Sequence, residues 1–170
     1  GTGADRFEVR NVTPQSAAVE QVLGSGQFAW TTGNAITDFA SGTDAFVFAA
    51  GFVGDGDTVI DTAEVRQTAG GFSAESELVI LRGDVVTPST GDLRRVDSAA
   101  IVAAIGSATS NYAANDTAIF VVDDGVSSAA FLFQSADDNS TVSADELFLL
   151  AVFTNTATLN TSDFSLELFI

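Results

Sequence analysis

The sequence contains no cysteine, histidine, lysine or methionine, and only two of its 170 residues are proline. Without cysteine the chain has neither a disulfide framework nor thiolate chemistry. Without histidine or lysine, a Ser-His-Asp triad, a Ser-Lys nucleophile, a histidine metal cluster and a P-loop lysine are excluded. Catalysis by two carboxylates, as in glycosidases, remains open in principle. The neighbouring acids Asp123 and Asp124 lie at a predicted turn, so we expect a structural role for them and no enzymatic activity.

Long apolar runs are also missing. The longest, Leu147 to Phe153, is far shorter than the roughly 20 residues of a membrane span, so we expect no membrane insertion. The first residues, Gly1-Thr2-Gly3, lack the basic and apolar stretches of a cleavable signal peptide. Two explanations stay open: the sequence begins inside a longer protein, or export uses a signal elsewhere.

Acidic residues, by contrast, are abundant. There are 23 Asp and Glu residues against six basic residues, all of them arginine, and the net charge is −17. Nucleic acids and anionic membranes are poor partners for such a chain. Multivalent cations, calcium first among them, are the natural counter-charge for carboxylates that repel one another in a compact fold. The alternative is that the acids only keep an extracellular or salt-tolerant protein soluble.

Short runs rich in Val, Ile and Phe alternate with Gly, Asp, Ser, Thr and Asn, a pattern typical of strands joined by turns. We predict a mainly β fold, either a β-sandwich or a β-roll-like structure with an antiparallel sheet, and one short α-helix. Asp123-Asp124-Gly125 predicts a hairpin turn. The predicted strands are Arg6 to Val9, Gly26 to Trp30, Ala45 to Phe48, Leu78 to Leu81, Ala118 to Val122, Ala130 to Phe133, Leu147 to Phe153 and Phe164 to Phe169.

The predicted helix is Ser98 to Ile105, which is rich in alanine and has apolar residues at helical spacing. Asp97 is its predicted N-cap, and Gly106 is expected to end it. Farther along, Ser143 to Glu146 has the spacing of a capping box before the Leu147 run. A helical turn and a strand are both open at that point.

The first seven residues, Gly1-Thr2-Gly3-Ala4-Asp5-Arg6-Phe7, fit the last part of the glycine-rich nonapeptide that binds calcium in parallel β-rolls. In that motif glycines turn backbone carbonyls toward the ion, and the aspartate, here Asp5, adds a charged oxygen. Residues 36 to 48, ITDFASGTDAFVF, resemble the segment that closes the β-roll in RTX proteins such as serralysin-type proteases. The resemblance implies that Asp38 is a ligand or cap for the last calcium and that Asp44 is its neighbour in the turn. We expect residues 1 to 54 to form a β-roll remnant and its closing segment.

Two acidic loops follow. Asp55-Gly56-Asp57 offers the oxygen ligands that calcium prefers, and its alternative is a solvated turn. The second loop, residues 135 to 146, has the ligand spacing of a twelve-residue EF-hand loop. Counted in that way, Asp137 is third, Asn139 fifth, the Thr141 carbonyl seventh, Ser143 ninth and Glu146 twelfth. The alternative is a degenerate loop that keeps the shape of an EF-hand loop but binds no calcium.

The last third of the chain contains the runs DTAIFVVDDG at 116 to 125, AFLF at 130 to 133, Glu146-Leu147, and LNTSDF at 159 to 164. These runs resemble bluetail domains, which lie at the C-terminal ends of large type I secretion substrates, and the resemblance covers residues 97 to 170. It implies that residues 55 to 170 form a β-rich export module. The tail from Asp163 to Ile170 is acidic and apolar without basic residues, like uncleaved type I signals, so we expect it to contact the type I secretion apparatus. It also fits a final core strand, and both interpretations hold, because the signal is read before folding.

Together these patterns predict a calcium-binding, non-catalytic structural and export module of a secreted bacterial protein, located outside the cell or on its surface. Calcium would act as the staple that a protein without disulfides needs. Two alternatives stay open. One is a self-assembling extracellular layer or filament subunit, which would be a homo-oligomer, and the other is the processed tail of a secreted hydrolase.

Overall fold

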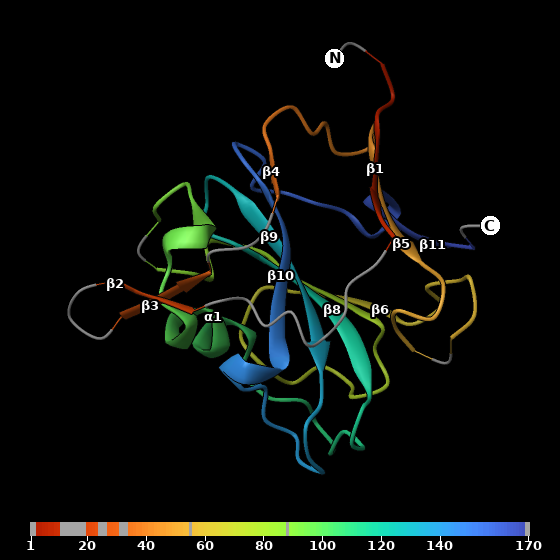
Figure 1. Cartoon of the computed structure of the whole chain (residues 1–170), viewed down its shortest axis with the longest axis vertical. Helices are drawn as coiled ribbons and strands as arrows, with labels where there is room; N and C mark the ends of the chain where they lie inside the picture. Colours follow the sequence, from red (N-terminus) through yellow and green to blue (C-terminus); the bar gives the residue numbers. More distant parts are fainter. Residues whose placement is uncertain are drawn as a thin grey trace.

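The computed structural model describes residues 3–10, 20–23, 27–30, 34–54, 56–87 and 89–168. Within these ranges the fold is mainly β with one α-helix, as predicted (Figure 1). Three short 3-10 helices lie at Leu93–Arg95, Ala144–Glu146 and Thr161–Asp163. The strands are β1 (Arg6–Val9), β2 (Glu20–Leu23), β3 (Gln27–Trp30), β4 (Asn34–Ile36), β5 (Ala45–Ala49), β6 (Ala63–Arg66), β7 (Leu78–Leu81), β8 (Thr117–Asp123), β9 (Ser128–Gln134), β10 (Leu147–Phe153) and β11 (Phe164–Glu167), and the helix is α1 (Ser98–Ile105).

The centre of the molecule is a six-stranded sheet in the order β4-β10-β9-β8-β7-β6. Its three middle strands pair in antiparallel fashion, whereas β7, β6 and β4 are added in parallel. The sheet is therefore mixed. The predicted hairpin is confirmed, because β8 and β9 pair directly and Gly125 lies in their turn with φ +79°, a conformation that glycine adopts without strain.

A second, three-stranded sheet has the order β1-β5-β11, and all of its strands are parallel. Phe7 lies opposite Phe46, and Phe46 lies opposite Phe164. The three strands lie together at the right of Figure 1 although they come from the beginning, the first third and the end of the chain. Strands of the first 54 residues thus share both sheets with later strands, because β4 pairs with β10 in the central sheet.

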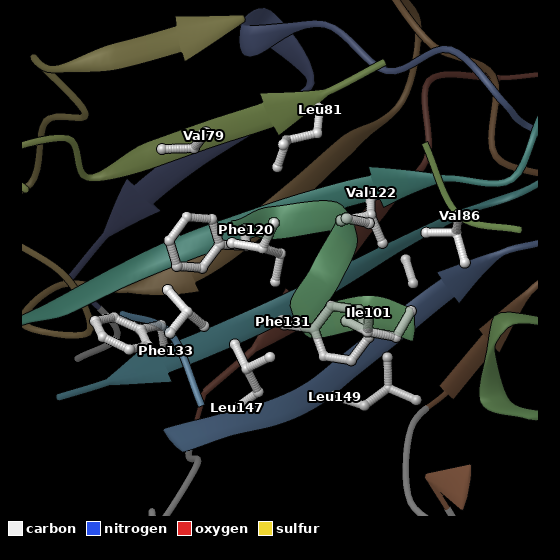
Figure 2. Packing of buried hydrophobic residues seen from close by; sticks show 14 of the residues in the cluster. Val79, Leu81, Val86, Ile101, Phe120, Val122, Phe131, Phe133, Leu147 and Leu149 are labelled. Carbon is white, nitrogen blue, oxygen red and sulfur yellow. The ribbon is translucent and has the colours of Figure 1, made fainter. Parts of the chain in front are cut away.

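Apolar side chains cover both faces of the six-stranded sheet. Along β8 the side chains alternate between the two faces, as the two-residue period of a strand requires: Phe120 and Val122 belong to one core cluster, and Ile119 and Val121 to the other. The first cluster lies between the sheet and α1, whose Ile101 packs near Phe131 and Leu149 in Figure 2. The second cluster joins the two sheets, so the molecule has three layers.

The inter-sheet core is rich in phenylalanine. Phe153 of the central sheet meets Phe46 and Phe164 of the three-stranded sheet edge to face, with ring centroids 5.2 and 6.4 Å apart. Such pairs add roughly 0.5–1.5 kcal/mol each beyond area burial. The core thereby fixes how the parallel sheet sits on the central one.

Helix α1 has the predicted bounds. The Asp97 side chain accepts a hydrogen bond from Ala99 N at 2.9 Å, as an N-cap does. The helix ends at Gly106, whose φ is +78° and whose added Cβ would lie 2.5 Å from Gly70 N. Only glycine fits that position, since the left-handed conformation and the close backbone contact both exclude a side chain.

Each of the eight predicted strands overlaps an observed strand, and β1, β7 and β10 have the predicted bounds. Three strands were missed, β2, β4 and β6, each of three or four residues. After Ser143 both predicted alternatives, a helical turn and a strand, occur one after the other. A 3-10 turn with a capping box leads directly into β10. No helix in the described parts of the chain is long and apolar enough to cross a membrane.

Candidate functional site

The acidic residues that the fold buries are held by backbone amides. Among the described residues six carboxylate side chains are buried: Asp44, Glu77, Asp123, Asp124, Glu146 and Asp163. A buried charge without compensation is strongly destabilising. Every one of these carboxylates accepts at least one hydrogen bond from a backbone N–H. Carboxylates used in this way tie loops to the sheets.

Asp44 and Asp5, both candidate calcium ligands, lie side by side at the start of β5 and β1. One oxygen of Asp44 accepts a hydrogen bond from Asp5 N and the other from Ala40 N, each at 2.8 Å. The hydrogen bonds from Asp5 N and then from Ala40 N hold the pKa of the Asp44 carboxyl below its usual range. Asp38 lies exposed in the segment leading to this turn. The closing segment is therefore joined to β1 by a carboxylate.

Asp163 has the same role in front of β11, although its sequence context did not indicate a site residue. Its side chain is fully buried. It accepts hydrogen bonds from Ser41 Oγ at 2.6 Å, Gly42 N at 2.7 Å and Asn160 N at 2.7 Å. The spacing of Asn160 and Asp163, which form a capping box, is the local signal that could have found it.

Asp123 and Asp124, at the end of β8, hold two loops. Asp123 accepts hydrogen bonds from Gly83 N at 2.9 Å and Asp84 N at 2.7 Å. Asp124 accepts from Thr90 N at 2.9 Å and from Gly91 N at 2.7 Å. Their side chains stabilise the chain between β7 and α1, in agreement with the expected structural role.

The predicted EF-hand-like loop, residues 135–146, is closed by Glu146. This side chain is buried, and Oε1 lies 2.8 Å from Ala136 N while Oε2 lies 2.8 Å from Ser143 N. The twelfth position of the loop is thus folded back onto the second. Asn139 Oδ1 accepts a hydrogen bond from Thr141 N at 2.6 Å, and Asn139 Nδ2 donates to Asp137 Oδ1. The structure therefore joins Asp137, Asn139 and Thr141 in one local turn, while Glu146 closes the base of the same loop.

The first acidic loop is separate from these groups. Asp57 is exposed and its Oδ1 accepts a hydrogen bond from Val59 N at 2.6 Å, which makes a local turn. Asp55 lies outside the described residues. Over the described ranges no three acidic side chains are close enough to hold a metal ion. The chemistry of the 135–146 loop still fits calcium, because its candidate ligands are carboxylate, amide and carbonyl oxygens.

An acidic pocket of about 410 Å³ opens beside the start of β7. Asp61, Glu75, Glu77 and Asp116 all line it. Glu77 is 5% exposed, and its Oε2 accepts a hydrogen bond from Asp61 N at 2.9 Å. Burial raises the pKa of the Glu77 carboxyl above its usual value, and the charge of Asp61 adds to the increase. Local sequence patterns do not reveal this pocket, because its acids come from three separate loops.

The chain matches no protein family model, no curated protein and no solved structure.

Proposed function

We propose that the protein is a calcium-binding, non-catalytic structural module of a secreted bacterial protein exported by a type I system. The observation that carries the proposal is the 135–146 loop. Its predicted ligands Asp137, Asn139, Thr141 and Glu146 have EF-hand spacing, and the loop is already closed on itself through Glu146. Because the loop is already ordered before binding, the loss of conformational entropy on binding an ion is smaller.

The frame of this loop is anchored to the rest of the protein. Ala108 N donates to Ser140 O and Tyr112 N donates to Asn139 O, both at 2.9 Å. Asp137 and Thr141 are exposed on the outer side. An ion would replace the internal hydrogen bonds between Asp137, Asn139 and Thr141 while the anchored backbone keeps its path. Binding would also offset part of the repulsion expected from a net charge of −17.

Calorimetry on matched variants tests the calcium proposal. We expect calcium to bind the wild type, and Asp137→Asn to weaken binding about tenfold or more, because a contact with a charged group contributes roughly 1.5–3 kcal/mol. Asp138→Asn is the control, since Asp138 is exposed in the same loop but occupies no ligand position. Magnesium should bind far more weakly, because it prefers a rigid octahedral site. Equal calcium affinity in the two variants would rule out this loop as the site.

The export part of the proposal depends on the tail from Asp163 onward. Residues 164–167 of this tail form β11, with Phe164 and Leu166 buried, and before folding the same residues would be free for recognition. Secretion from cells that carry a type I apparatus tests this role. A chain lacking residues 164–170 should stay inside the cells while the full chain is secreted, and unchanged secretion of the shortened chain would contradict the proposal.

A further inference from the structure

The parallel sheet β1-β5-β11 has two outer edges, formed by β1 and β11. Within the described part of the chain neither outer edge pairs with another strand. Because all three strands run in one direction, the outer edge of β11 matches the outer edge of β1 in polarity. An unpaired edge is a template for a further strand.

The sheet follows one rule from strand to strand. An aspartate precedes each strand: Asp5 before β1, Asp44 before β5 and Asp163 before β11. Asp44 binds an amide at the start of β1, and Asp163 binds an amide in the turn before β5. The phenylalanines Phe7, Phe46 and Phe164 lie opposite one another across the sheet. The same register can continue from β11 to a strand like β1.

We infer that the protein self-associates head to tail, with β1 of a second copy adding in parallel to the outer edge of β11 and with Phe7 opposite Phe164. This inference does not depend on calcium binding to the 135–146 loop. The interface uses different patches on the two copies and is therefore heterologous. Repeated along an open path, such an interface produces a filament.

The main-chain groups have the right direction for this pairing. Ala45 N donates to Asp5 O at 2.9 Å, so alternate residues Asp5, Phe7 and Val9 direct their polar backbone groups to β5. The backbone groups of Arg6 and Glu8 therefore point to the outer edge. On the other side Ala50 N donates to Glu167 O at 2.7 Å, so the groups that point outward belong to Phe164 and Leu166. In the inferred register Glu8 N donates to Phe164 O of the neighbouring copy.

The side chains complement one another in the same register. Phe7 and Val9 are only half-buried in the single chain, and they would pack beside Phe164 and Leu166. Arg10 would lie opposite Glu167. Within one chain Arg10 pairs with Glu8 and Glu167 pairs with Arg6, and since these side chains are 66% and 45% exposed the contact between copies would add to these surface pairs. Opposite charges across neighbouring strands favour pairing. The net charge of −17 opposes it at long range, so association should require salt or calcium to screen the repulsion.

Sedimentation and negative-stain electron microscopy of the whole chain test the inference. In physiological salt with millimolar calcium, the wild type should form concentration-dependent oligomers and filaments. Glu8→Pro removes the outward amide of β1 without removing a bond to β5, and it should weaken association about tenfold at each junction. Glu8→Ala is the control, because it loses the same carboxylate but keeps the amide. Circular dichroism checks that both variants fold.

Two further results distinguish this interface from others. A small fraction of Glu8→Pro added to the wild type should shorten the filaments, since this variant keeps its β11 edge but lacks a working β1 edge. Arg10→Glu should also weaken association, because it puts two acids opposite each other, whereas Arg10→Ala should have a smaller effect. A wild type that stays monomeric at millimolar concentration would overturn the inference. Equal association of Glu8→Pro and Glu8→Ala would do the same.

Discussion

The carboxylate of Asp163 accepts a hydrogen bond at 2.7 Å from the backbone amide of Gly42, which lies 121 residues earlier in the chain. Asp44 makes the corresponding contact with Asp5 N, 39 residues away. In both cases an acid that precedes one parallel strand holds the backbone in front of the neighbouring strand. Part of the large acid content of this protein therefore stabilises tertiary structure. Replacing these acids should lower the free energy of unfolding more than replacing exposed acids.

Replacing Asp163 by Asn should lower the free energy of unfolding by about 2–3 kcal/mol, because a buried charged acceptor of three hydrogen bonds is lost. Urea unfolding measures the change. Asp138→Asn is the control, and as an exposed substitution it should stay within about 0.5 kcal/mol of the wild type. Similar values for both variants would contradict the role assigned to Asp163.

Asp44 should make the stability depend on pH at the acid end. Its folded pKa lies below the unfolded value of 3.8, so the stabilisation is present above the unfolded pKa and is lost as the pH falls through the folded pKa. Asp44→Asn should therefore be less stable than the wild type at neutral pH, and the difference should shrink below a pH of about 4. Thermal melting across this range measures it. A difference that does not change with pH would be inconsistent with the shifted pKa, and the exposed Asp145→Asn serves as control.

Glu77 should have the opposite effect. Its folded pKa is raised above the unfolded value of 4.5, so its favourable contribution is present below the unfolded pKa and is lost as the pH rises through the folded pKa. Glu77→Gln, which resembles the protonated form, should therefore be more stable than the wild type at neutral pH. The two proteins should converge as the solution becomes acidic. Glu75→Gln, which changes an exposed acid of the same pocket, is the matched control in the same melting experiment.

Gly106→Ala should destabilise the protein by more than about 1 kcal/mol. The new Cβ would meet Gly70 N at 2.5 Å in addition to the strain of a positive φ. Gly51→Ala separates the two effects, because Gly51 has φ +83° with no atom within 4 Å of the added Cβ. Chemical unfolding of both variants should give the larger loss at Gly106. Equal losses would mean that the contact between Gly106 and Gly70 adds nothing.

Local patterns predicted the elements that depend on near neighbours. The helix over Ser98–Ile105 has its expected cap and end, and β7 and β10 are apolar runs with the expected bounds. Strand β6 was missed because Val65 is its one β-branched residue, and its pairing with β7 across a long connection decides its conformation. The parallel pairing of β1, β5 and β11 was missed for the same reason, since no local pattern encodes it.

Sequence patterns likewise predicted one part of the candidate site, the 135–146 loop, and did not predict the other part, the acidic pocket. The turn from Asp137 to Glu146 could be predicted, because its hydrogen bonds join residues at most ten apart. The acidic pocket could not, because Asp61, Glu77 and Asp116 meet only when β6, β7 and β8 pair.

The sequence by itself determined which chemistry is open to this protein, since it has no cysteine, histidine or lysine, and it determined a mainly β fold with one helix. These properties follow from composition and from contacts within a few residues. Only the tertiary structure decided which carboxylates are buried and which amides they bind. The donors for Asp44, Asp123 and Asp163 include amides 39 to 121 residues away, and such partners exist only after the parallel strands and their loops have come together.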